Sequence, residues 1–182
     1  MSKNGSAMFC SRFVVLIGLL GLLGGCAGPK IAVDKLTATP ASEKPICACA
    51  YDLSVTINPQ INNWEGIDKS VQESLDMALA NAKLFTAGAA TRYRVTADIR
   101  VASEPAMSFG DFNGKLEILY TVLDQSGQTL VAKDIYTEAG TDNWTFLGAE
   151  RHRRARALNI AKNVLEFTTF LRASGFAGGP RS

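Results

Sequence analysis

Two cysteines and a run of arginines are the residues of this chain best suited to chemistry. Cys47 and Cys49 are one residue apart, so in an extended strand they point to the same side with Cα atoms about 6.5 to 7 Å apart. That separation is at the upper limit for a disulfide. We therefore expect two small, buried side chains that belong to the core. A redox-labile disulfide and an intermolecular bridge remain alternatives. Metal binding is disfavoured because the one histidine, His152, is far away in the sequence.

The arginines occupy the first turns of a long C-terminal helix, where its apolar stripe should continue. They are Arg151, Arg153, Arg154 and Arg156. We expect these turns to overhang the sheet in water, although arginine stems lying along the sheet and an anion site are alternatives. From residue 149 onward seven Lys/Arg stand against two acidic residues, whereas residues 26–148 carry ten against fifteen. This asymmetry favours an anionic partner or an intramolecular match.

The N-terminal residues form a secretory leader. Lys3 and Arg12 are its only charges, and an apolar run of about eleven residues follows from Phe13 to Leu23. A spanning helix needs about 20 apolar residues, so this run is too short. The leader ends at Leu23-Gly24-Gly25-Cys26.

These four residues resemble the lipobox of bacterial lipoproteins, in which the cysteine is acylated and becomes the mature N-terminus. The resemblance implies lipidation of Cys26, a signal peptide over residues 1–25, and attachment to a membrane. In enteric-type sorting an Asp after the cysteine retains a lipoprotein in the inner membrane. Ala27 stands at that position, so the resemblance implies the outer membrane, with the domain facing the periplasm.

The mature chain divides into a tether, one domain and a tail. Residues 26–45 contain three prolines and no clean period, as expected of the lipidated cysteine and a flexible tether. Residues 46–173 are long enough for a single core. Residues 174–182 are rich in glycine and predict a disordered tail.

Periodicity within the domain predicts six elements. A strand with alternating burial runs from Cys47 to Ile57, and a helix has the apolar stripe Ile67, Val71, Leu75, Ala78 and Ala82. A second strand has Tyr93 to Val101 inward at alternate positions, a third covers Lys115–Asp124, and a turn at 125–128 leads to a fourth, Thr129–Glu138. The fourth alternates poorly and is expected to be an edge strand or to contain a bulge. The last helix, Ala149–Arg172, should bury Ala157, Leu158, Ala161, Val164, Leu165, Thr168 and Leu171.

This order predicts an α+β fold: a two-layer β-α-β-β-β-α sandwich with both helices on one face of a four-stranded mixed sheet. In a lipidated domain of this size the architecture is similar to the lipopolysaccharide-assembly lipoprotein and, more loosely, to auxiliary lipoproteins of envelope lipid transporters. An accessory or scaffold role in a cell-envelope complex is the leading expectation, because the fold is small and tethered and has no catalytic motif.

The search for catalytic motifs gives no positive signal. The sequence has no Gly-x-Ser-x-Gly, phosphate-binding glycine loop or His-Glu-x-x-His motif. We expect no enzyme, no cofactor apart from the lipid, no metal and no nucleic-acid partner. An envelope protein is the expected partner, and an anionic lipid or glycan is the alternative. An enzyme is the third class, with nothing specific in its favour.

A right-handed crossover would make the first two strands parallel and bring three loops to the end of the sheet remote from the tether. Those loops carry Trp64, Phe109, Trp144 and Phe146 beside the arginines. Aromatic side chains next to arginines are typical of interface hot spots. The sequence therefore predicts a partner surface at this end, although the same side chains could instead cover the open end of the core.

Overall fold

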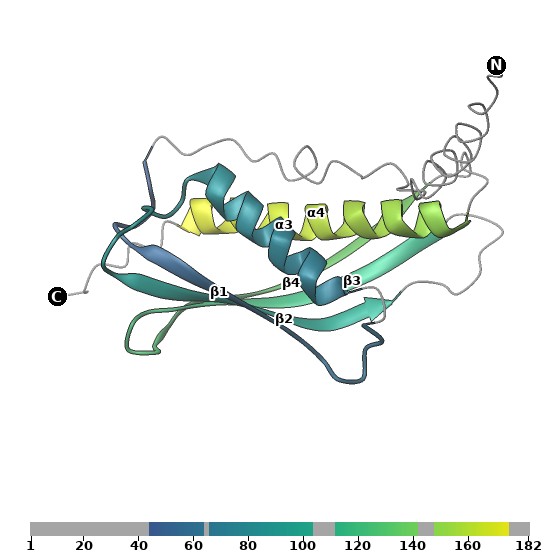
Figure 1. Ribbon diagram of the computed structural model, residues 1–182, viewed down its shortest axis with the longest axis horizontal. Coiled ribbons are helices and arrows are strands. Elements are labelled where there is room, and N and C mark those ends of the chain that lie inside the picture. The colour runs from purple at the N-terminus through teal and green to yellow at the C-terminus, as the bar shows by residue number, and fades with distance from the viewer. Residues whose placement is uncertain (1–43, 64–65, 104–111, 142–147, 175–182) are drawn as a thin grey trace, which may run out of the picture. The chain divides into compact units, whose positions relative to one another are not determined.

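The computed structural model describes residues 44–63, 66–103, 112–141 and 148–174 of the chain. The predicted order of elements and the α+β class are confirmed. The elements are β1 (Ala50–Ile57), α3 (Ile67–Ala82), β2 (Arg92–Ser103), β3 (Phe112–Leu123), β4 (Thr129–Thr141) and α4 (Gly148–Ser174). The sheet has the order β1-β2-β3-β4, and both helices lie on the same side of it (Figure 1).

Strand pairing gives the sheet its mixed character. β1 and β2 are parallel from Ala50 opposite Arg92 to Ile57 opposite Ile99, and the other two pairs are antiparallel. A parallel pair needs a long crossover, which α3 provides. The expected parallel pairing of the first two strands is thus confirmed.

Helix α3 follows its predicted pattern. All five residues of the predicted stripe are buried, joined by Ser74 and Leu79. The first amide of the helix is satisfied from the preceding loop, because Oδ1 of Asn63 accepts a hydrogen bond of 2.8 Å from the amide of Ile67. Gly66, just before the helix, has φ of 66°, a left-handed conformation that glycine adopts without a steric penalty.

Helix α4 buries a face that overlaps only in part with the predicted one. Ala161, Val164, Thr168 and Leu171 are buried as expected, but Ala157, Leu158 and Leu165 are only half-buried. Their places on the inner face are taken by other residues, two of them polar. The additional buried residues are Ala155, Asn159, Ile160, Asn163 and Phe167.

Asn163 explains why a polar residue occupies this face. Its Oδ1 accepts a hydrogen bond of 2.7 Å from the Tyr120 hydroxyl. Its Nδ2 donates to the carbonyl oxygen of Ile135 and to Oγ1 of Thr137, both at 3.0 Å. The ring of Tyr120 also stacks on Phe167, with centroids 4.1 Å apart. Burial raises the pKa of Tyr120, so its hydroxyl remains a donor at physiological pH. This polar network joins α4 to both β3 and β4.

A β-bulge in β2 corrects a second expectation. The register with β3 shifts between Ile99 and Val101, leaving Arg100 as the extra residue. Val101 then pairs with Glu117. The extra residue turns Val101 away from the helices, and Ala102 packs against the core in its place. Arg100 Nη1 donates to Asp134 Oδ2 at 2.9 Å on the side of the sheet away from the helices.

β4 is an edge strand of the sheet, as expected. It also has an irregular register: Val122 pairs with Val131, but Leu123 pairs with Thr129, so Leu130 has no partner in the ladder. Both features proposed for this strand from its poor alternation are therefore present.

The network around Asn163 gives the first prediction. Replacing Asn163 with Leu leaves the buried Tyr120 hydroxyl without an acceptor, so Asn163→Leu should lower the free energy of unfolding by about 2 to 4 kcal/mol. Adding Tyr120→Phe removes the orphaned hydroxyl, and the double variant should lose less than the sum of the two single losses. Urea unfolding of the four proteins measures this. Strict additivity would show that the bond between Tyr120 and Asn163 contributes nothing specific.

Candidate functional site

The strand directions define two ends of the sheet. At the loop end β1 finishes at Ile57, β2 finishes at Ser103, and Phe112 of β3 pairs with Thr141 of β4. At the hairpin end β1 and β2 begin, and residues 124–128 connect β3 to β4. The three segments expected to converge therefore all leave the sheet at one end.

Only part of the predicted partner surface can be described. Trp64, Phe109, Trp144 and Phe146 lie outside the described residues, as does the side chain of Arg151. Arg153 and Arg154 are exposed on α4, whereas Arg156 is half-buried. Ala155 between them is fully buried, so α4 already packs on the core at this point. The expectation that these turns overhang the sheet is wrong for residue 155 onward.

A small hollow lies beside Arg156 at this end. It has a volume of about 20 Å³ and lies between α4, the start of α3 and the paired ends of β2 and β3. Its lining includes Ile67, Ala102, Gly114, Leu116, Arg156 and Asn159. Gly114 has no side chain to fill the space under α4. A cavity of this size holds about one water molecule, so it is too small for an acyl chain or a sugar ring.

Asn159 is the polar residue most completely enclosed at the hollow. It is 4 % exposed, and its Nδ2 donates to the carbonyl oxygen of Gly114 at 2.9 Å. Its Oδ1 is buried and has no hydrogen-bond partner in the described structure. The amide thus helps to hold α4 over β3, and one of its two polar groups faces a gap that one water could fill. The helical periodicity of the sequence gave no signal for Asn159, because a polar residue of an amphipathic helix is ordinarily assigned to the solvent-exposed face.

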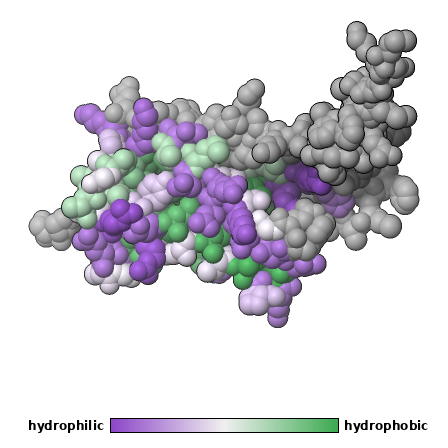
Figure 2. All heavy atoms as spheres, in the orientation of Figure 1, coloured by the Kyte–Doolittle hydropathy of each residue, from purple (hydrophilic) through white to green (hydrophobic). Residues whose placement is uncertain are grey.

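A larger groove lies along the outer side of α3. It has a volume of about 420 Å³, with Leu53 on β1 and four polar residues of the helix as its lining: Lys69, Gln72, Glu73 and Asp76. These four residues are exposed and lie on the face of α3 opposite its buried stripe. Figure 2 shows hydrophobic areas separated by hydrophilic ones on the visible side of the domain, without one continuous apolar surface.

The surface of the sheet opposite the helices is charged. Arg92 on β2 forms an ion pair with Asp52 on β1, and Lys115 on β3 lies 3.7 Å from Glu138 on β4. The hydrogen bonds from Arg92, together with its positive charge, lower the pKa of the Asp52 carboxyl. Exposed pairs of this kind contribute little to stability, and their regular spacing is typical of a solvated face.

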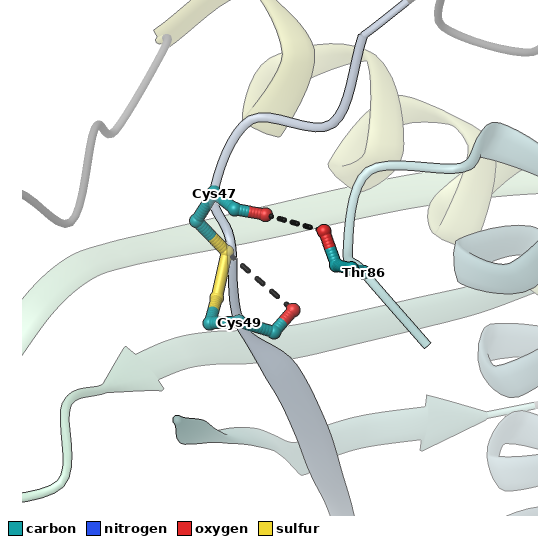
Figure 3. The surroundings of a disulfide bond; sticks show 3 residues. All are labelled: Cys47, Cys49 and Thr86. Atoms are coloured by element: carbon teal, nitrogen blue, oxygen red, sulfur yellow. Dashed lines mark hydrogen bonds between the residues drawn. A yellow bond between two sulfur atoms is a disulfide. The ribbon is translucent and has the colours of Figure 1, made fainter. Parts of the chain in front are cut away.

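The two cysteines lie at the hairpin end. The structure joins Cys47 and Cys49 in a disulfide with Cα atoms 5.2 Å apart (Figure 3). The expectation of two unbridged core residues is therefore wrong. It assumed that β1 starts at Cys47, whereas the strand starts at Ala50 and residues 46–48 bend. Cys49 is 1 % exposed and belongs to the core, and Cys47 is half-buried.

Within the described residues no group of three or more His, Cys, Asp or Glu side chains is arranged to hold a metal ion. The helices that the structure describes are also not long and apolar enough to cross a bilayer.

Asn159 offers a comparison with Asn163. Because Asn159 makes a single hydrogen bond and its Oδ1 has no partner, Asn159→Leu should lower the free energy of unfolding by about 1 kcal/mol or less. Urea unfolding beside Asn163→Leu measures the difference. Equal losses for the two variants would mean that Oδ1 has a strong partner in solution, such as a tightly held water.

Comparison with known proteins finds remote structural likeness only. No family model matches the chain, and no curated protein matches it significantly. A structure from Xanthomonas campestris, described by the family model DUF330, has 13% identity and a TM-score of 0.47, covering 74% of this chain and 87% of that one. A minor lipoprotein from Acinetobacter baumannii has 11% identity and a TM-score of 0.46, covering 67% and 92%. A protein from Caulobacter crescentus, provisionally named a lipoprotein, has 11% identity and a TM-score of 0.44, covering 79% and 95%. At these values the likeness carries no functional conclusion.

Proposed function

We propose that this protein is a lipoprotein of the bacterial envelope, anchored through Cys26, whose domain serves as an accessory subunit of an assembly or transport complex. The observation that carries the proposal is the sequence Leu23-Gly24-Gly25-Cys26 at the end of a short apolar leader. Stable anchoring needs more than one acyl chain. A cleaved and acylated cysteine carries these chains and places them at the N-terminus of the mature protein. Ala27 favours the outer membrane, with the domain in the periplasm.

The topology of the domain supports a partner surface away from the lipid. The chain enters β1 at the hairpin end, and the loop end is at the opposite end of the same strands. A domain tethered by residues 26–45 would therefore hold its loop end farthest from its point of attachment. The chain leaves β1, β2 and β4 at this end, and loops on a rigid scaffold commonly bind partners.

Charge indicates the chemistry of that partner. Arg153 and Arg154 are exposed in the second turn of α4. We propose that they face an acidic patch on an envelope protein. Arginine suits such contacts because its planar group binds carboxylates in a bidentate manner.

An anionic lipid or glycan remains the second candidate, since the same two arginines would attract a phosphate or a carboxylate. Among the described residues, however, the hollow between helices and sheet has room for about one water. A lipid would thus have to bind at the surface through its headgroup. For this reason we place a protein partner first.

The anchor is tested by changing the acylated residue. Cys26→Ala should abolish acylation, so the protein should move from the membrane pellet to the soluble fraction or persist as an uncleaved precursor. Mass spectrometry of the wild-type N-terminus should find acyl chains on Cys26. An unmodified N-terminus beyond Cys26 would refute the lipoprotein proposal. Cys10→Ala within the leader is the matched control and should leave anchoring unchanged.

The partner surface is tested with a pair of charge reversals. The measurement is the amount of a stoichiometric partner that is recovered when the lipidated protein is purified from the envelope of its own cell. Arg153→Glu at the loop end should lower this amount by about tenfold, the size of loss expected for an arginine in an interface. Arg94→Glu, exposed near the hairpin end, is the control and should retain the partner. Both variants should keep the wild-type melting temperature. Equal recovery with both variants would remove the loop end from the proposal, and recovery of lipid without protein would favour the second candidate.

A further inference from the structure

The segment Ile46–Cys49, called the lead-in segment here, is held to the loop after α3 by three hydrogen bonds. The amide of Ile46 donates to the carbonyl oxygen of Leu84 at 2.8 Å. The amide of Thr86 donates to the carbonyl oxygen of Cys49 at 2.8 Å, and its hydroxyl donates to that of Cys47 at 3.1 Å. Thr86 therefore binds both cysteines through their backbone, as Figure 3 shows for Cys47.

The disulfide gives the lead-in segment the bend that these contacts require. Two residues of an extended strand separate Cα atoms by about 6.6 Å, whereas Cys47 and Cys49 are 5.2 Å apart. The bond thus pulls the chain out of the strand conformation at Ala48, and β1 begins only at Ala50. Without the bond, nothing covalent keeps the two carbonyl groups turned toward Thr86.

Global stability does not account for this disulfide. The stabilisation that a disulfide gives the folded state rises with the length of the loop it closes. A Cys-x-Cys bridge closes one of the shortest loops possible, and the domain already has a continuous core without Cys47. The effect of the bond is local to the lead-in segment.

We propose that the Cys47–Cys49 disulfide is a reversible redox site that locks and releases the lead-in segment, with a dithiol protein of the thioredoxin class as its reductant. The two sulfurs differ in access, since Cys47 is half-buried and Cys49 is 1 % exposed. An incoming thiolate attacks the sulfur of Cys47 and forms a mixed disulfide with it, while Cys49 leaves as a thiolate and takes up a proton. The second thiol of the reductant then attacks the mixed disulfide and releases Cys47. Two electrons pass to the cysteine pair, and the reductant becomes a disulfide.

The reduced state also has a place for its new proton. Sγ of Cys47 lies 3.8 Å from the carbonyl oxygen of Cys49. A disulfide sulfur has no hydrogen to donate there, but the thiol of reduced Cys47 has one. The domain can therefore accept reduction without leaving that thiol unsatisfied.

Release of the lead-in segment would lengthen the flexible connection to the lipid. Four residues of extended chain span at most about 13 Å, which would be added to the reach of the tether. This consequence rests on the proposed anchoring through Cys26, whereas the redox step itself does not.

The test uses the full-length protein in detergent, equilibrated with reduced and oxidised glutathione at a series of ratios. Alkylation followed by mass spectrometry counts the thiols, and hydrogen exchange follows the amides of Ile46 and Thr86. Reduction should expose two further thiols, which the mass spectra should assign to Cys47 and Cys49, while the domain stays folded. It should also raise exchange at these amides at least tenfold. The amides of Val95 and Ile99 in β2 should keep their protection.

Two variants complete the experiment. Cys47→Ser with Cys49→Ala should show fast exchange at Ile46 and Thr86 whatever the glutathione ratio. Thr86→Val loses the hydroxyl bond to Cys47 but keeps the disulfide, so exchange at Ile46 should still respond to reduction. The proposal fails if the cysteines resist reduction until the domain unfolds, or if reduction leaves exchange at both amides unchanged. Neither outcome depends on lipidation or on a partner, so a failure of the proposed function would be seen separately.

Discussion

The parallel pairing of β1 with β2 is the constraint on which the rest of the architecture depends. Parallel neighbours cannot be joined by a tight turn, so the chain must leave the sheet after Ile57 and return to its other end before Arg92. Helix α3 makes that return across one face and thereby defines the side on which the core forms. The two antiparallel strands that follow add width, and α4 buries its inner face on the same side, because the opposite face of the sheet is charged.

The two helices are held to the sheet by different physical means. Helix α3 is held mainly through its apolar stripe by the hydrophobic effect, with one exposed side-chain hydrogen bond of 2.7 Å from the Tyr51 hydroxyl on β1 to Oδ1 of Asp76. Helix α4 combines apolar residues with two buried amides, which donate to carbonyl oxygens of β3 and β4. Hydrogen bonds are directional where hydrophobic contacts are not, so Asn159 and Asn163 select one rotation and one axial position of the helix. This directional fixing matters for α4 in particular, because the helix begins at the loop end.

This difference also explains which parts of the structure the sequence could predict. The buried face of α3 follows from periodicity that the tertiary structure leaves intact, and the parallel pairing of the first two strands follows from the crossover rule. The inner face of α4 could not be predicted from periodicity. The sequence does not distinguish an asparagine that is buried by hydrogen bonds to another element from one that is exposed to water. Val101 was misplaced because a bulge changes the parity of every later residue in its strand. The disulfide was expected only as an alternative, because the separation of Cys47 and Cys49 was judged from strand geometry that these residues do not have. The arginines were found as a group, but the topology, not their spacing, locates Arg153 and Arg154 at the loop end.

The bulge at Arg100 affects how this chain can be compared with others. One residue in β2 has no counterpart in β3, so a related domain without the bulge would be one residue shorter between Ile99 and Ala102. An alignment that forbids a gap inside a strand would then match core positions with solvent positions from Val101 onward. Because β2 ends at Ser103, the error covers the last three residues of the strand, and the core-packed Ala102 is one of them. Alignments of this chain should therefore allow a single-residue gap at Arg100.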